Sequence, residues 1–307
     1  MVAGRSGGWA DLGESRGEIK SRGERKRLQI ISHFPESLVG MKSQVEKVTS
    51  LLDMKSNDVR SIGIWGMGDI GKTEIARVLY QRYRHRFEAA CFIGVGTLYQ
   101  TNGLTWLVQV VICKLLGKNM TLNSDHEGVI ILKNMLRRKK VLLILDDVNH
   151  REQLEFLVGG TEWFGRGSKI ILTARDKQLL ISHVGDNMYE VQLLSENEAL
   201  ELFSRHAFRE KSPLKDFMEL SKQVVEYAGG LPLALKILGS SVYKRDKMQW
   251  RDIINRLKRI PHNDILGKLR LNFDGLDKDG KEIFLDIAFL DITSMGKYNN
   301  KSFVEEY

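Results

Sequence analysis

The stretch Gly66-Met-Gly-Asp-Ile-Gly-Lys-Thr73 decides the fold of this 307-residue chain, because it fits the pattern G-x-x-x-x-G-K-[ST]. The apolar run Ser61–Trp65 precedes it as a buried-strand candidate, and apolar residues at helical spacing follow it over residues 75–83. In such a strand–loop–helix unit the glycines let backbone N–H groups wrap phosphate oxygens, and the helix N-terminus adds positive charge. We therefore predict a phosphate-binding loop, with the Lys72 ammonium on the β and γ phosphates and the Thr73 hydroxyl on Mg²⁺.

A second motif, Leu142-Leu-Ile-Leu-Asp146-Asp147, is an apolar run typical of a central parallel strand, and it ends in two acids. Taken alone, the two acids could simply cap the following loop. Ligands bind at the carboxyl edge of open parallel sheets, however, and the phosphate-loop motif lies upstream. We predict that Asp146 holds Mg²⁺ through water and that Asp147, the candidate catalytic residue, orients an attacking water.

A third strand candidate lies within Lys169-Ile-Ile-Leu-Thr173-Ala-Arg175 and ends in a hydroxyl and a guanidinium. If this strand neighbours the other two, Arg175 lies near a terminal phosphate, which a guanidinium binds through two parallel hydrogen bonds. The alternative is an ordinary surface arginine at a strand end.

Strand and helix patterns alternate up to residue 191. We predict strands at 61–65, 90–95, 141–145, 168–172 and 189–191, and helices at 38–52, 75–83, 104–116, 129–136, 153–157 and 177–182. This alternation indicates a parallel sheet with right-handed crossovers. From Ser195, which forms a capping-box pattern with Glu198, only helical patterns follow, at 196–208, 217–228, 231–243, 250–258 and 264–273. The predicted fold class is therefore α/β, a P-loop-type parallel sheet followed by a helical domain.

The composition excludes several classes of protein. The chain has 47 basic and 39 acidic residues, a net charge of +8, and lacks the ~18-residue apolar run of a membrane helix, so we expect no membrane partner. Its cysteines, Cys91 and Cys113, are too few for a disulfide framework and lack metal-site spacing, which favours a reducing compartment. We interpret residues 1–33 as a flexible leader without a secretory signal. The basic residues cluster at helix ends, so a solvated surface is favoured over nucleic-acid binding.

The chain resembles the NB-ARC domains of plant immune receptors, the nucleotide-binding leucine-rich-repeat resistance proteins of the TIR class. The resemblance covers about residues 35–292 and rests on five motifs in the same order: GMGDIGKT, LLILDDV, GSKIILTARD, Gly229–Leu235 and Phe284–Phe289. It implies a P-loop domain over 34–192, a helical ARC1 domain over 193–262 and, over 263–307, the start of a winged-helix ARC2 domain that is cut short. We expect neither an NAD-cleaving TIR domain nor leucine-rich repeats in this chain.

The resemblance also implies a function, a switch in plant innate immune signalling that holds ADP at rest and ATP with Mg²⁺ when activated, with slow or no hydrolysis. The expected partners are further copies of the chain or full-length immune receptors, in the cytoplasm and also in the nucleus. The alternative is a nucleotide-independent adaptor or decoy that docks on full-length receptors. A fast ATPase ranks lower because Asp147 stands where such enzymes carry Glu, and a nucleic-acid binder ranks lower because no recognition helix is evident.

Carried over residue by residue, the resemblance implies that Leu38 and Val39 meet the adenine and that Pro232 brings the helical domain against the nucleotide. The nucleotide-binding set is then Leu38, Val39, Gly66, Met67, Gly68, Asp69, Ile70, Gly71, Lys72, Thr73, Glu74, Arg175 and Pro232. The metal set is Thr73 and Asp146.

Several residues near the predicted site depart from the family pattern. Asp69 replaces a glycine, which adds a negative charge near the phosphates and a side chain where positive φ is expected. Glu74 replaces a threonine and adds negative charge near Mg²⁺, Ala174 replaces a threonine, and 94–96 lacks a polar Arg-Glu pair. From Asp69 we expect weaker phosphate binding or faster nucleotide exchange.

Overall fold

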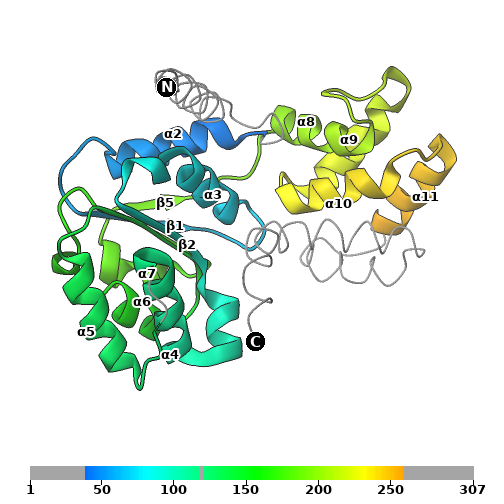
Figure 1. Cartoon of the computed structure of the whole chain (residues 1–307). Helices are drawn as coiled ribbons and strands as arrows, with labels where there is room; N and C mark the ends of the chain where they lie inside the picture. The colour runs from blue at the N-terminus through cyan, green and yellow to red at the C-terminus, as the bar shows by residue number, and fades with distance from the viewer. Residues whose placement is uncertain (1–38, 118–119, 259–307) are drawn as a thin grey trace, which may run out of the picture. The chain divides into compact units, whose positions relative to one another are not determined.

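The computed structural model describes residues 39–117 and 120–258 (Figure 1). Its first part is built on a sheet of five parallel strands. These strands are β1 (Arg60–Trp65), β2 (Ala89–Gly94), β3 (Val141–Val148), β4 (Lys169–Ala174) and β5 (Met188–Glu190). Their order across the sheet is β2-β3-β4-β1-β5, so β4 lies between β1, which precedes the phosphate loop, and β3, which carries the two acids near its end. The predicted parallel α/β sheet is confirmed.

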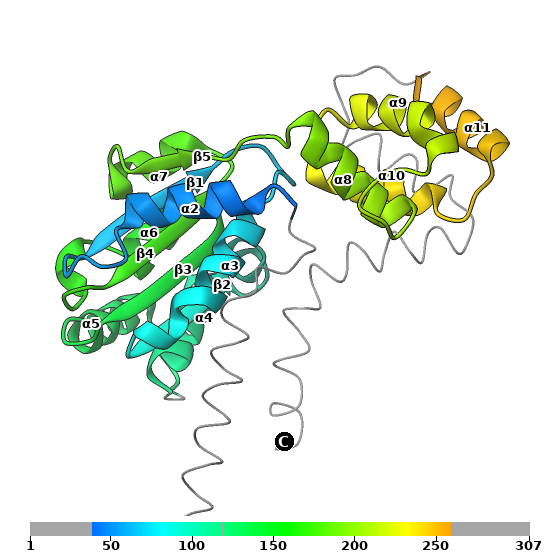
Figure 2. The same ribbon diagram turned by 90° about the horizontal axis from the view of Figure 1, so that it is seen from above.

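Helices cover both faces of this sheet, as the view from above shows (Figure 2). One face packs against α2 (Met41–Leu52) and α3 (Lys72–Tyr83). The layer on the other face consists of α4 (Val95–Leu116), α5 (Asp125–Leu136), α6 (Arg151–Leu157) and α7 (Lys177–Val184). Because successive strand residues point to opposite faces, β3 and β4 are buried on both sides, which explains their continuous apolar runs.

The connection after β2 differs from the prediction. Val95 was expected to end a strand, but the strand ends at Gly94 and Val95 begins α4. This helix is interrupted at Gly103, whose φ of 79° and ψ of −177° are not helical, so only its second half matches the predicted helix at 104–116. A short apolar run does not distinguish the end of a buried strand from the start of a buried helix, which is why the boundary was missed.

The second part of the described chain is helical, as predicted from Ser195 onward. It consists of α8 (Glu196–Ala207), α9 (Met218–Ala228), α10 (Pro232–Val242) and α11 (Lys247–Lys258). Ser195 and Glu198 form the predicted capping box at the start of α8, and Pro232 occupies the first turn of α10. Short 3₁₀ turns occur at Arg84–Arg86, Thr161–Trp163 and Lys215–Phe217.

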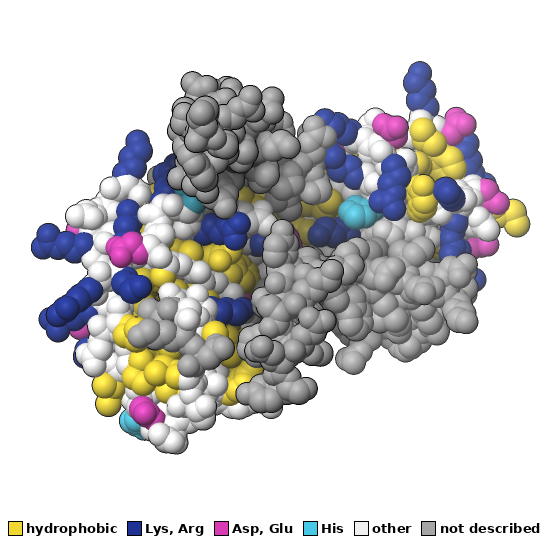
Figure 3. Space-filling view, in the orientation of Figure 1, with side chains coloured by type: hydrophobic (Ala, Val, Ile, Leu, Met, Phe, Trp, Pro, Cys, Tyr) yellow, Lys and Arg dark blue, Asp and Glu magenta, His cyan; other side chains and the backbone are white. Residues whose placement is uncertain are grey.

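Parts of the prediction fall outside the described residues, namely the leader at 1–33, the helix at 264–273 and the winged-helix start at 263–307. Within the described residues, no helix combines the length and the apolar character that crossing a membrane requires. Lys and Arg side chains are spread over both the α/β and the helical elements on the face drawn in Figure 3, which fits a solvated basic surface.

Candidate functional site

The phosphate-loop motif joins β1 to α3 through a turn with several left-handed residues. Gly66 has a φ of 149°, Asp69 a φ of 60° and Gly71 a φ of 109°. The backbone at Gly71 requires glycine because of this φ, whereas the end of the Met41 side chain, 2.6 Å from where a Cβ atom would lie, could move aside. Asp69 has the positive φ that was expected at its position, and aspartate is among the residues that tolerate it.

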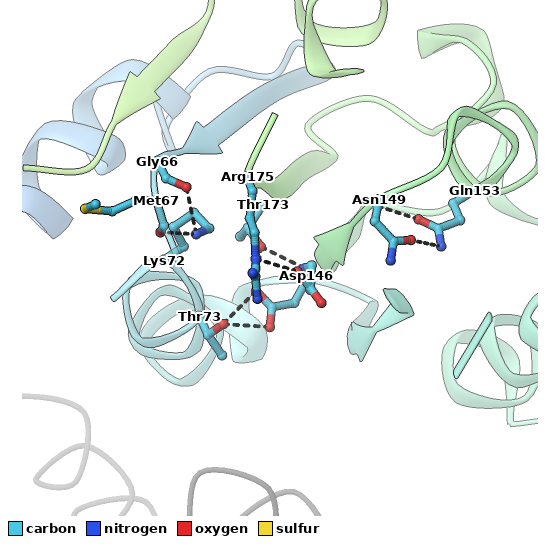
Figure 4. Close-up of polar contacts among 10 residues, drawn as sticks. Gly66, Met67, Lys72, Thr73, Asp146, Asn149, Gln153, Thr173 and Arg175 are labelled. Atoms are coloured by element: carbon cyan, nitrogen blue, oxygen red, sulfur yellow. Dashed lines mark hydrogen bonds and ion pairs between the residues drawn. The ribbon is translucent and has the colours of Figure 1, made fainter. Parts of the chain in front are cut away.

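The Lys72 side chain lies against its own loop (Figure 4). Its ammonium donates hydrogen bonds to the backbone carbonyl oxygens of Gly66, at 3.0 Å, and Met67, at 2.7 Å. Burial lowers the pKa of Lys72 and the Arg175 guanidinium lowers it further, whereas three nearby carboxylates raise it. An ammonium held by two carbonyl oxygens at the N-terminus of a helix is well placed to bind an anion such as phosphate.

Asp146, near the end of β3, is a buried acid whose carboxylate accepts hydrogen bonds from two threonine hydroxyls. Thr73 Oγ1 of α3 lies 3.1 and 2.9 Å from the two carboxylate oxygens, and Thr173 Oγ1 of β4 lies 2.6 Å from Oδ1 (Figure 4). Burial raises the pKa of Asp146, and the hydrogen bonds from the two hydroxyls oppose that shift. The two residues predicted to share a metal ion thus contact each other directly in the structure, while their metal binding stays a prediction.

Asp146 and Asp147 form a β-bulge, because at this point two residues of β3 face one residue of β4, Thr173. Asp147 has a φ of 58°, and its backbone N–H donates to Thr173 Oγ1 at 2.9 Å. Its Oδ1 atom lies 4.0 Å from Arg175 Nε, and a Cβ atom on Gly96 would lie 2.6 Å from its Oδ2 atom. The two adjacent acids thus have different surroundings, hydroxyl groups for Asp146 and a guanidinium for Asp147.

Arg175 follows β4 directly, and its side chain is 68 % exposed. Its predicted place near a phosphate required the strand before it to neighbour the strands of the phosphate loop and of the two acids, and β4 does lie between β1 and β3. The structure therefore brings Arg175 to the edge of the sheet that carries the phosphate loop and the acids, while its role as a phosphate sensor stays a prediction.

The other predicted residues are distributed as follows. Leu38 lies outside the described residues, and Val39 lies in the turn before α2. Glu74 is paired with the Arg77 guanidinium one turn later in α3, which offsets the negative charge that its position adds. Pro232 begins α10, and its predicted contact with the nucleotide is not tested by the structure.

The site offers oxygen ligands of the kind that Mg²⁺ prefers. Among the residues that the structure describes, no group of three or more His, Cys, Asp and Glu side chains could hold a metal ion. Instead Thr73 and Asp146 present one hydroxyl and one carboxylate side by side. Mg²⁺ is commonly bound by one or two carboxylates together with waters and substrate phosphates, so this donor set fits a metal that arrives with a nucleotide.

One residue of the site, and one buried polar residue outside it, were not singled out from the sequence. Thr173 was recognised only as a strand-end hydroxyl, although it contacts both acids. Gln44 of α2 is buried and holds both β5 and the chain after it. Its Oε1 accepts from the Tyr189 hydroxyl of β5 and from the Gln192 backbone N–H, and its Nε2 donates to the Gln192 carbonyl oxygen. A polar residue on the apolar face of the helix at 38–52 was the signal that could have indicated Gln44.

The fold and the site together define a nucleotide-binding domain of the P-loop class. Residues 41–213 match the model of the NB-ARC domain, and the chain belongs to this family. Three of its relatives are plant proteins. TMV resistance protein N of Nicotiana glutinosa is 38 % identical over 270 residues, covering 86 % of this chain and 23 % of that protein. Disease resistance protein RUN1 of Vitis rotundifolia is 40 % identical over 255 residues, covering 82 % of this chain and 19 % of that protein.

Disease resistance protein RPP5 of Arabidopsis thaliana is 38 % identical over 262 residues, covering 83 % of this chain and 18 % of that protein. The resemblance to plant resistance proteins indicated by the five motifs is thus confirmed, and the chain spans about a fifth of the length of these relatives. A crystal structure of Cdc6p from Pyrobaculum aerophilum shares the fold, with a TM-score of 0.51 at 15 % identity over 67 % of this chain and 62 % of that chain.

Proposed function

We propose that this chain binds an adenine nucleotide with Mg²⁺ and acts as a switch, with ADP in the resting state and ATP in the activated state. The observation that carries the proposal is the convergence of Lys72, Thr73 and Asp146 at the carboxyl edge of the sheet. The loop supplies backbone N–H groups and one cation for the phosphates, and the acid and hydroxyl supply oxygen ligands for the metal.

The residues of the site divide the work of binding. Lys72 leaves the carbonyl oxygens of Gly66 and Met67 when phosphate oxygens offer it a charged partner. Thr73 can keep donating its proton to Asp146 while its oxygen lone pairs face Mg²⁺. Mg²⁺, when bound, neutralises charge on the phosphate oxygens.

Hydrolysis in this site is proposed to be slow. Asp147 is the candidate water-orienting residue, but its carboxylate lies beside Arg175 and its backbone is held in the bulge. An ion-paired carboxylate is a weaker acceptor for a water proton than a free one. Binding, rather than turnover, is then what the site performs.

The proposed setting is innate immune signalling in a plant cell, in the cytoplasm and also in the nucleus. This part of the proposal is supported by the relatives, which are named as resistance proteins of plants. The proposed partners are further copies of the chain or full-length immune receptors. The proposed domains are a P-loop domain at 34–192, ARC1 at 193–262 and the start of ARC2 at 263–307.

The test is the nucleotide content of the purified chain, released by denaturation and identified by chromatography. We expect about one ADP per chain for the wild type and none for Lys72→Ala, because the variant lacks the cation for the phosphates. Lys42→Ala, on the exposed side of α2, is the matched control and should retain ADP. An empty wild-type protein that also ignores added ADP and ATP would overturn the proposal.

A further inference from the structure

Thr173 is the residue at which the two acids of the site are joined, and none of the predicted site sets contains it. We propose that Thr173 is a positioning residue: its hydroxyl orients Asp146 toward Mg²⁺ and at the same time holds the bulge that directs Asp147 to Arg175. The inference rests on the proposed nucleotide and metal binding and assigns a part of it to a residue of β4.

The hydrogen-bonding capacity of the Thr173 hydroxyl is committed on both sides. It has one proton and two lone pairs. The proton is donated to Asp146 Oδ1 at 2.6 Å, and a lone pair accepts the Asp147 backbone N–H at 2.9 Å. Because Thr173 is only 1 % exposed, water has little access to replace either contact.

The bulge itself creates the need for such a group. Where two residues of β3 face one residue of β4, the extra residue loses its partner in the strand ladder. Asp147 is that residue, with a left-handed φ of 58°. Its N–H points to the Thr173 hydroxyl instead of a carbonyl oxygen, so a side chain of β4 stabilises the backbone conformation of β3.

Asp146 is therefore held from two directions. Thr73 approaches from the phosphate-loop helix α3, and Thr173 approaches from β4. Thr73 belongs to the loop that meets the phosphates, whereas the hydrogen bonds of the Thr173 hydroxyl go to the two acids of β3. Removing the Thr173 hydroxyl should thus weaken the metal-dependent part of nucleotide binding and spare the metal-independent part.

The experiment measures the dissociation constant of ADP by titration calorimetry, with Mg²⁺ and with EDTA, for three variants and the wild type. Thr173→Val keeps the shape of the side chain and removes the hydroxyl, and Thr173→Ser keeps the hydroxyl. Thr49→Val on α2 is the matched control, because Thr49 Oγ1 is buried without a hydrogen-bond partner among the described residues.

We expect Mg²⁺ to tighten ADP binding in the wild type, in Thr173→Ser and in Thr49→Val. In Thr173→Val, Mg²⁺ should bind the ADP complex about 10- to 100-fold more weakly, the usual effect of removing a group that orients a metal ligand. Mg²⁺ should therefore tighten ADP binding less in this variant than in the wild type. The ADP affinity in EDTA should stay at the wild-type value. A Mg²⁺ gain in Thr173→Val equal to that of the wild type would overturn the inference, and so would an equal loss with and without Mg²⁺.

A wild-type chain that binds no ADP under either condition would refute the proposed function and the metal-orienting half of the inference. Whether the Thr173 hydroxyl holds the bulge is then tested by amide hydrogen exchange at Asp147, measured by NMR without any ligand. We expect exchange at least tenfold faster in Thr173→Val than in Thr173→Ser, because only the valine variant leaves the N–H without an acceptor. Equal exchange rates in the two variants would overturn this half as well.

Discussion

Asp69 combines two unfavourable features in one residue of the phosphate loop. Its φ of 60° lies in the left-handed region, where residues with a Cβ atom pay a conformational cost and glycine does not. Its carboxylate also adds negative charge to a loop whose task is to hold phosphate, although it raises the pKa of Lys72. These two effects can be separated by substitution.

We predict that Asp69→Asn and Asp69→Gly both tighten ADP binding by removing the negative charge, and that Asp69→Gly in addition stabilises the folded chain by relieving the left-handed backbone. The expected gain is about 2- to 10-fold for the glycine variant, equivalent to about 0.4–1.4 kcal/mol. Titration calorimetry in low salt measures it. If Asp69→Asn and Asp69→Gly both bind more weakly than the wild type, the carboxylate supports the loop and the argument from charge fails.

At the scale of elements, the imidazole ring of His206 is partly buried where α8 packs against α10. A Cβ atom on Gly239 would lie 2.7 Å from His206 Cβ, so the two helices approach closely at this glycine. His206 Nδ1 lies 3.5 Å from Ser240 Oγ. Burial, followed by the charges of Lys236 and Arg209, lowers the pKa of His206 to about 4.

This shift predicts the pH dependence of the helical part. In the unfolded chain the histidine binds its proton near pH 6.5, so between about pH 6.5 and 4 the unfolded state holds more protons than the folded state. Stability is therefore complete above pH 6.5 and falls as the pH drops toward 4, by an amount on the order of 1–3 kcal/mol.

Urea unfolding at a series of pH values measures this dependence. His206→Gln should flatten the slope, and His126→Gln, whose ring is 83 % exposed, should leave it unchanged. A slope that persists unchanged in His206→Gln would assign the pH dependence to other groups.

The elements also show which signals in a sequence carry structural information. The strands at 141–145 and 168–172 were predictable because a strand that is buried on both faces of a parallel sheet has a continuous apolar run. The site residues of the phosphate loop were predictable because loop geometry demands particular residues at fixed spacing. The bulge at Asp147 was not, because it depends on the register of β3 against β4, which no residue pattern within either strand specifies. The burial of Gln44 was indicated by its place on an apolar helix face, but its partner Tyr189, 145 residues away, was not.

On the scale of the whole molecule, the described chain contains an apolar core around the sheet and an aromatic cluster in the helical part. Trp250 of α11 contacts the rings of Phe203, Phe208 and Phe217, and its Nε1–H donates to the Val242 carbonyl oxygen at 3.0 Å. The two acids lie on β3, a strand of the first core, and the phosphate loop leads into α3, which packs on β3. A ligand bound there stabilises the α/β elements by mass action.

We predict that ADP with Mg²⁺ at 100 times its dissociation constant stabilises the α/β elements by about 2.7 kcal/mol. For a part of about 150 residues, this corresponds to a rise in melting temperature of about 5–10 °C. Differential scanning calorimetry measures the shift. Replacing Mg²⁺ by EDTA should reduce the rise, because Asp146 and Thr73 then lose their shared ligand, and Lys72→Ala should abolish it. An equal rise in Lys72→Ala would place the stabilising nucleotide somewhere other than the loop at 66–73.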